Sequence, residues 1–480
     1  MIQPLAYISR QGLFLASLII STSIAAQNII ETLPYGSRVT TQIELLGESS
    51  SKQALGNNQQ LFPPASTLKL VTALAAKLTL AEDFRFTTEI YRHQEDLIIR
   101  FSGDPLLRRE HLSNLLTQAK AQGITTIQGD IWLDNSVFDG YERAVGWPWD
   151  ILGVCYSAPS SAISLDKNCI QASIYTNQDG STRVFVPQHQ PIIATTRATT
   201  VSTQVQQETH CTLELTPDDN NHYHLDGCLV ARDKPLPLRF AVQNTAQYVS
   251  LVLEQLLIQH NIAFEGHIHV GAKPDFQYGQ PLAQHTSVEL DQLLVKMLKS
   301  SNNLIADNLT KTLGHVVFQT PGTFTNGTEA IKQVVLEHSG IDLTHARLAD
   351  GSGLSRNNLL TSEDMAKVLR YIWQQEERLG LIELMPTAGE SGTLQYRRSM
   401  RKAPVKGNII AKSGSVYGTY NMAGFGLDQQ GKPQTLFVQF VADYHPIKKR
   451  DGIATTAPIT LFETEFYQQV VEFSQAMPKK

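Results

Sequence analysis

The sequence predicts an α/β (α+β) protein in which one unit is interrupted by a large, β-rich insertion. A helix is expected to begin early, at about Ser66, directly after two prolines. Three strand-like runs and a long amphipathic helix close the chain, over 408–413, 420–427, 435–443 and 459–477. Between them, residues 170–240 are rich in threonine and turn residues, which is typical of short strands. The two ends of the chain are therefore expected to build one unit around the insertion.

Length and composition limit the class of protein. A chain of 480 residues is too long to fold around one hydrophobic core, so we expect two or three domains. Its content of 42% hydrophobic and 18% charged residues is ordinary for a globular protein. A net charge of −5 and a pI near 6.3 give no support for a nucleic-acid partner or a polybasic membrane surface.

The N-terminus has the pattern of a secretory signal peptide over residues 1–26. One cation, Arg10, precedes an uncharged apolar stretch, and the small residues Ala25 and Ala26 follow it. This stretch is too short to span a bilayer comfortably, although an uncleaved membrane anchor is the alternative. Export to an oxidising compartment also fits an even number of cysteines, four in all. The sequence therefore predicts a secreted protein with at most peripheral membrane association.

Ser66 and Lys69 form a candidate catalytic pair. A serine hydroxyl is a weak nucleophile until a base takes its proton, and a buried lysine can be neutral enough to do so. The same Ser-x-x-Lys spacing occurs three more times, and each instance lies outside an apolar helix: Ser49/Lys52, Ser164/Lys167 and Ser399/Lys402. Only Ser66 opens an apolar-periodic helix, whose N-terminus offers free N–H groups to an oxyanion.

Two further motifs follow this pair along the chain, and each carries groups that can assist a serine nucleophile. The run Ser300-Ser301-Asn302-Asn303 lies within a helical region expected over 290–313 and allows two Ser-x-Asn registers. A hydroxyl and an amide there can relay protons and hold a carbonyl. Ser355-Arg356-Asn357 matches the same pattern. Lys412-Ser413-Gly414 is the only Lys-Ser-Gly or Lys-Thr-Gly, and its cation on an edge strand can bind a carboxylate.

These three motifs are those of penicillin-binding proteins and class A β-lactamases. Almost the whole chain after the signal resembles the class C low-molecular-mass penicillin-binding proteins, the D-alanyl-D-alanine carboxypeptidase/endopeptidase family. The resemblance rests on shared segments, among them 62–69, Gly103-Asp104-Pro105, 146–150, 156–159, 350–356, Gly392-Thr393-Leu394 and 411–415. The family pattern Lys-x-Ser-Asp-Asn-x-x-Ala-Asp, which here ends at Asp307, fixes the second motif at Ser301 and Asn303. Asn302 and Ser413 depart from the usual Asp and Thr, and neither departure changes the expected reaction.

The resemblance implies a penicillin-binding/β-lactamase-like transpeptidase domain, formed by residues 27–83 and 275–480. It implies that the insertion makes two β-rich domains, residues 84–165 with 240–274 and the nested residues 166–239. Three pairings of the four cysteines are open, and the sequence-local one, Cys155 with Cys169 and Cys211 with Cys228, is favoured.

The resemblance also assigns roles to the motif residues. Ser66 is the nucleophile, Lys69 its base, and Ser301 and Asn303 relay protons and orient the substrate. Lys412, Ser413 and Gly414 bind the substrate, and the N–H groups of Ser66 and Ser415 form the oxyanion hole.

The expected activity is that of a periplasmic serine D-Ala-D-Ala carboxypeptidase and D-alanyl-meso-diaminopimelyl endopeptidase. It acts on peptidoglycan peptides without a cofactor or metal, and β-lactams acylate it. One alternative is a catalytically inactive cell-wall-binding protein. The other is a zinc peptidase using His267 and His269 or His222 and His224, although no His-Glu-x-x-His motif accompanies these pairs.

Overall fold

The computed structural model describes residues 30–47, 51–446 and 456–476. The predicted signal peptide lies outside these residues. The chain divides into two compact units, which we call unit 1 (Met1–Thr67 with Leu360–Lys480) and unit 2 (Leu68–Leu359). Within the described residues, no helix is both long and apolar enough to cross a bilayer.

Unit 1 is built on a five-stranded antiparallel sheet that joins the two ends of the chain. The strand order is β19-β20-β21-β1-β2. The bounds are β1 Arg38–Leu45, β2 Lys52–Leu55, β19 Ile409–Val416, β20 Thr419–Leu427 and β21 Pro433–Ala442. The central strands β20 and β21 are buried along nearly their whole length, so both faces of the sheet are covered.

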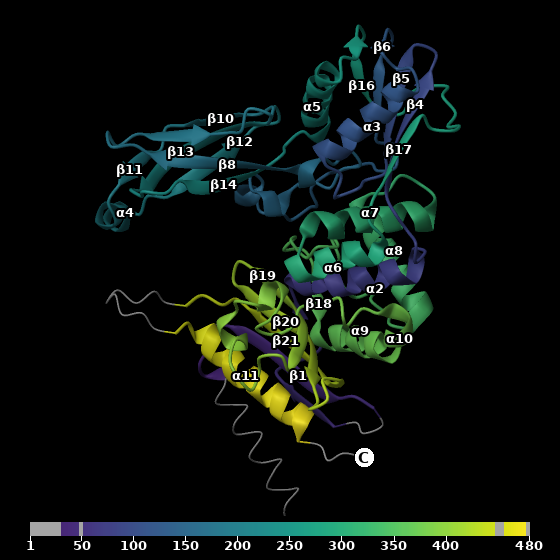
Figure 1. Ribbon diagram of the computed structural model, residues 1–480. Coiled ribbons are helices and arrows are strands. Elements are labelled where there is room, and N and C mark those ends of the chain that lie inside the picture. The colour runs from purple at the N-terminus through teal and green to yellow at the C-terminus, as the bar shows by residue number, and fades with distance from the viewer. Residues whose placement is uncertain (1–29, 48–50, 447–455, 477–480) are drawn as a thin grey trace, which may run out of the picture. The chain divides into compact units, whose positions relative to one another are not determined.

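Helices cover the two faces of this sheet. Ile43 of β1 packs in a core with Phe466 and Val470 of α11 (Pro458–Gln475), which runs along the sheet in Figure 1. Neighbouring positions of β1 face the other way, where Thr40 contacts Ser362 of α9 (Ser362–Gln374). Because successive strand residues point to opposite faces, unit 1 is a helix–sheet–helix sandwich. Shorter elements complete it: β3 Leu61–Phe62, which pairs with β18 Leu360–Thr361, η1 Ala65–Leu68, α10 Glu376–Leu379, η5 Gly392–Leu394 and η6 Arg398–Met400.

Unit 2 contains a cluster of four helices, shown in Figure 1. They are α2 Lys69–Thr79, α6 Leu290–Ser300, α7 Asn303–Phe318 and α8 Phe324–Ser339. α7 is buried over most of its length and contacts the other three. The single helix expected over 290–313 was therefore wrong, because the chain breaks after Ser300. Ser301 takes a left-handed φ of 55°, and the Asn302 side chain caps the new helix by accepting a hydrogen bond from the N–H of Ile305.

The insertion supplies the remaining elements of unit 2. A five-stranded mixed sheet has the order β16-β7-β5-β4-β17, and α3 and α5 pack beside it. The bounds are β4 Thr87–His93, β5 Asp96–Phe101, α3 Arg109–Ala121, β6 Thr126–Ile127, β7 Ile131–Asp134, α5 Thr245–Gln259, β15 Ala263–Phe264, β16 Ile268–Val270 and β17 Ala283–Thr286.

The segment between β7 and α5 forms short strands, as its composition predicts. One sheet has the order β14-β8-β9, and a second has β10-β13-β11 with β12 paired to β13. Their bounds are β8 Cys169–Thr176, β9 Thr182–Phe185, β10 Ile193–Thr196, β11 Thr199–Val201, α4 Thr203–Thr209, β12 Leu213–Pro217, β13 His222–Val230 and β14 Leu236–Ala241. Three short 3₁₀ turns precede them: η2 Trp149–Ile151, η3 Cys155–Ser157 and η4 Asp166–Asn168. Disulfides join Cys155 to Cys169 and Cys211 to Cys228, the sequence-local pairing.

A buried ion pair fixes α11 within unit 1. The Glu463 carboxylate is almost fully buried and accepts hydrogen bonds from the Arg397 guanidinium and the Ser399 hydroxyl. We predict that Glu463→Ala lowers the free energy of unfolding of unit 1 by about 3 kcal/mol, because it leaves the Arg397 charge buried without its partner. In denaturant titration, Lys52→Ala should cost less than about 1 kcal/mol, because the Lys52–Glu363 pair is more exposed. Equal losses of unfolding free energy in the two variants would contradict the stabilising role given to the buried Arg397–Glu463 pair.

Candidate functional site

The segment that carries Ser66 begins in a tight turn. Ala65 has a left-handed φ of 48°, an uncommon conformation for a residue with a side chain. The N–H and hydroxyl of Thr67 both bond to the carbonyl of Pro64, which holds the turn closed. Ser66 lies within the 3₁₀ helix η1, and α2 begins only at Lys69. The helix expected at about Ser66 therefore starts as a 3₁₀ turn, in which residues three apart eclipse each other.

β19 packs against the Ser66 backbone within unit 1. A Cβ atom added to Gly414 would lie 2.9 Å from the amide nitrogens of both Ser66 and Thr67. Only glycine allows β19 to approach the backbone of the serine this closely. The Asn421 amide of β20 donates to the Pro63 carbonyl at 2.8 Å and so ties the same sheet to the loop before Ser66. The Lys-Ser-Gly motif and Ser66 thus lie together.

The side chains of the Lys-Ser-Gly motif are held in place by near neighbours. Lys412 is fully buried, and its ammonium donates to the Ser413 carbonyl at 2.7 Å. The Ser413 hydroxyl lies 2.7 Å from the hydroxyl of Thr393. β19 is an edge strand of the sheet, and residues 386–388 pair with it at Ile409–Ala411, so a peptide can add alongside the part that follows Ala411. Sequence reasoning assigned no role to Thr393, although Gly392-Thr393-Leu394 was among the family segments.

Lys69 is the best-defined element of the site in unit 2. Its side chain is fully buried, and its ammonium donates to Asn303 Oδ1 and to the Ser352 carbonyl, each at 2.6 Å. Burial lowers the pKa of Lys69 to about 8, against the opposing attraction of the Asp307 and Asp350 carboxylates. A lysine with this pKa is partly neutral near neutral pH and can accept a proton.

Asp307, the last residue of the family pattern around the second motif, is a buried carboxyl group to which the sequence reasoning gave no role. It accepts hydrogen bonds from the N–H groups of Gly351 and Ser352, the residues beside the carbonyl that Lys69 contacts. Burial and the neighbouring Asp350 carboxylate hold the pKa of Asp307 well above its usual range. Its position one turn after Asn303 on α7, on the same face, was the available signal.

The structure distinguishes the two Ser-x-Asn registers. Asn303 accepts from Lys69, and its amide donates to the Tyr156 carbonyl at 2.7 Å. Asn302 instead caps α7, and the Ser300 hydroxyl donates to the Lys296 carbonyl of its own helix. The register of Ser301 and Asn303 is therefore the one that reaches Lys69.

The competing motifs have structural roles. The Ser355 hydroxyl donates to the Val145 carbonyl, the Ser164 hydroxyl to the Ser161 carbonyl, and the Ser399 hydroxyl to Glu463. Ser49 lies outside the described residues.

The histidine pairs face carboxylates and hydroxyls. His269 contacts Asp130 at 2.9 Å, His222 contacts Asp218 at 3.1 Å, and His224 contacts Thr195 at 2.7 Å. Within the described part of the chain, no group of three or more His, Cys, Asp or Glu side chains is arranged to hold a metal.

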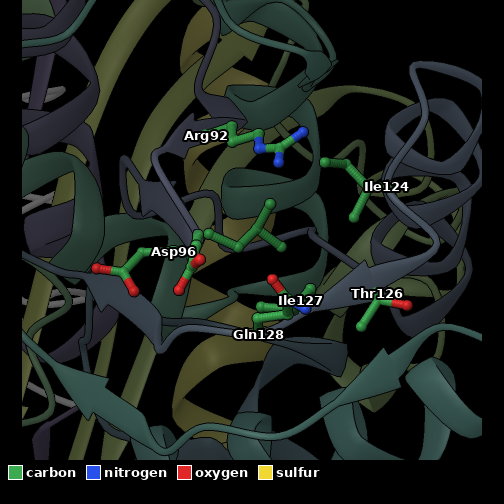
Figure 2. Close-up of a pocket in the computed structure, with 8 residues that line it drawn as sticks. Arg92, Asp96, Ile124, Thr126, Ile127 and Gln128 are labelled. Atoms are coloured by element: carbon green, nitrogen blue, oxygen red, sulfur yellow. The ribbon is translucent and has the colours of Figure 1, made fainter.

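Two hollows differ greatly in size. A groove of about 1040 Å³ in unit 2 is lined in part by Tyr156, Ser301 and Asn303. By contrast, the pocket in Figure 2, near Asp96 and Gln128, measures about 30 Å³. That volume holds little more than a water molecule, whereas the groove is large enough for a peptide.

The fold and these motifs are those of a serine peptidase of the penicillin-binding class, and comparison with known proteins confirms this. The chain belongs to the D-Ala-D-Ala carboxypeptidase 3 (S13) family, whose model matches residues 46–466. The family resemblance and the mixed α/β fold predicted from the sequence are thereby confirmed.

Individual relatives match over nearly the full length. The chain is 36% identical to the D-alanyl-D-alanine carboxypeptidase DacB of Haemophilus influenzae, over 96% of this chain and 98% of that one. It is 30% identical to the D-alanyl-D-alanine carboxypeptidase of Actinomadura sp. strain R39, over 82% of this chain and 76% of that one. The crystal structure of penicillin binding protein 4 from H. influenzae aligns with a TM-score of 0.85 at 36% identity, covering 93% of this chain and 99% of that chain. The protein is thus a D-alanyl-D-alanine carboxypeptidase and a serine hydrolase.

The choice of register gives a test. We predict that Asn303→Ala slows acylation by a β-lactam by roughly 10 to 150-fold, because it removes a hydrogen bond to a buried cation. Asn302→Ala should change the acylation rate by less than about 3-fold and lower the free energy of unfolding by about 1 kcal/mol, because it removes only a helix cap. Stopped-flow acylation and denaturant titration measure the two effects. The reverse pattern would move the motif to the other register.

Proposed function

We propose that this protein is exported to the periplasm, where it acts on peptidoglycan both as a D-Ala-D-Ala carboxypeptidase and as an endopeptidase of D-alanyl-meso-diaminopimelyl cross-links. The N-terminal signal pattern and the two disulfides support export. The carboxypeptidase names of its relatives support the substrate class. The volume of the groove beside Ser301 and Asn303 supports substrates larger than a terminal dipeptide.

In this proposal the reaction passes through an acyl-enzyme on Ser66. Lys69 takes the hydroxyl proton as the serine oxygen attacks the carbonyl between the two D-amino acids. The N–H groups of Ser66 and Ser415 stabilise the oxyanion. As the tetrahedral intermediate collapses, the C–N bond breaks and the leaving amine takes a proton, relayed through Ser301. Water then attacks the ester and releases Ser66.

The remaining motif residues bind and orient the substrate in this scheme. Asn303 positions Lys69 and the substrate. Lys412 and Ser413 bind the terminal carboxylate, for which a buried cation beside a hydroxyl is well suited. A β-lactam acylates Ser66 by the same attack and leaves slowly. A related crystal structure of penicillin binding protein 4, complexed with a β-lactam, supports this part.

One observation carries the proposal: the buried Lys69 ammonium, bonded to Asn303 and lowered in pKa to about 8, at the residue where α2 begins, three positions after Ser66. An ion-paired structural lysine would keep a high pKa. A lysine prepared in this way has the properties of a general base.

We predict that a fluorescent penicillin labels Ser66, and that the purified protein releases D-alanine from a D-Ala-D-Ala pentapeptide and also cleaves cross-linked muropeptide dimers. Mass analysis of the products and peptide mapping of the label measure these outcomes. Ser66→Ala should lose both the label and both activities. Undiminished labelling of Ser66→Ala would show that Ser66 is not the nucleophile. Dimers that remain intact while D-alanine is released would refute the proposed endopeptidase activity.

A further inference from the structure

The large groove of unit 2 extends well beyond the residues assigned to the chemistry. From Ser301 and Asn303 it continues between the start of α3 and the paired strands β8 and β14. On β14, Arg239 stands directly opposite Gln171 of β8, and both side chains are exposed on the groove wall. The groove therefore joins the candidate site to the β-rich insertion.

Positive charge collects along this groove in a chain whose net charge is −5. Four permanent cations line it: Arg108, Arg109, Lys167 and Arg239. Its two carboxylates, Glu110 and Asp166, offset two of these four charges: Glu110 accepts from the Arg108 guanidinium at 3.3 Å, and Asp166 accepts from the backbone N–H of Arg109 at 3.2 Å. The remaining charge in the groove favours an anionic ligand.

Lys167 is held in the groove by a strained turn. Asp166, Lys167 and Asn168 all have left-handed φ values, of 49°, 63° and 49°. Such conformations are unfavourable for residues with side chains and persist only where the surroundings hold them. Here the buried Asn168 side chain accepts from the Leu165 N–H and donates to the Pro159 carbonyl, each at 3.0 Å.

The strained turn leaves Lys167 exposed on the groove wall. No described residue forms an ion pair or a hydrogen bond with its ammonium group. A turn of this kind keeps a cation available for a ligand.

The wall that carries Lys167 is covalently fixed to the candidate site. The disulfide between Cys155 and Cys169 links the first residue of β8, directly after this turn, to the segment that contains Tyr156. The carbonyl of Tyr156 accepts the hydrogen bond from the Asn303 amide. The cations and Asn303 therefore belong to one connected framework.

We propose that this groove binds the second stem peptide of a cross-linked substrate through that peptide's free carboxylates. The inference rests on the proposed endopeptidase function and deepens it. A cross-linked dimer differs from a linear D-Ala-D-Ala peptide by carrying a whole second stem, and this stem has several carboxylates. Lys167 and Arg239 meet those carboxylates, and a linear peptide has no second stem that could bind them.

The test compares two substrates on three variants: Lys167→Ala, the double variant Lys167→Ala/Arg239→Ala, and the control Lys234→Ala. Lys234 is an exposed lysine of the same β-rich segment that does not line the groove. We expect the double variant to raise KM for the muropeptide dimer by roughly 3 to 30-fold with little change in kcat, because two solvent-facing charge contacts are lost. Hydrolysis of the linear pentapeptide should stay within about 2-fold. Lys234→Ala should match the wild type on both.

Direct binding gives a readout that does not depend on catalysis. Calorimetric titration of the dimer into Ser66→Ala protein should give a Kd that rises by the same factor when Lys167 and Arg239 are removed. A dimer with amidated carboxylates should bind both proteins equally weakly. Equal KM changes on the two substrates, or an unchanged dimer Kd, would overturn the groove assignment. A wild type that takes no penicillin label and cleaves neither substrate would instead refute the proposed function, and the dimer titration would still decide the groove.

Discussion

The burial of one ammonium group, that of Lys69, is the constraint on which the arrangement of unit 2 depends. Removing a lysine from water costs several kcal/mol unless polar groups replace the lost hydration. Here Asn303 Oδ1 and the Ser352 carbonyl supply hydrogen bonds, and the Asp307 and Asp350 carboxylates supply attraction. This compensation is partial, because the pKa still falls to about 8. Because the compensation is incomplete, the Lys69 amine can lose its proton near neutral pH and act as a base.

Each partner of Lys69 requires a specific piece of local structure. Asn303 is the first residue of α7 because the left-handed Ser301 ends α6 and Asn302 caps the next helix. Without that break, Asn303 would lie inside one continuous helix, and its side chain would point in a different direction.

The site residues of unit 1 also depend on local conformation. Gly414, which has no side chain, lets β19 lie against the Ser66 backbone. These are conformational requirements that only a few residue types meet.

The sequence predicted the α/β character, the early helix, the closing strands and the order of the three motifs, because these depend on periodicity and on local residue types. It did not predict the break at Ser301, since a left-handed residue leaves no periodic signal in an apolar run. It placed Asp307 in the family pattern without predicting its contact with the Gly351 and Ser352 backbone, which joins segments far apart in the chain. The catalytic and binding roles of Ser66, Lys69, Ser301, Asn303, Lys412 and Ser415 stay predictions.

The pH dependence of Ser66 acylation tests the role of Lys69 most directly. A β-lactam whose own charge is constant between pH 6 and 10 should acylate the protein with a rate that rises about tenfold per pH unit and levels off above an apparent pKa of about 8. The rate rises because only the neutral amine of Lys69 can accept a proton, and the lowered pKa places the plateau near pH 8 instead of above about pH 10, where an ordinary lysine would place it. A rate that is flat from pH 6 to 10, or that falls as the pH rises, would show that the neutral amine of Lys69 is not the base.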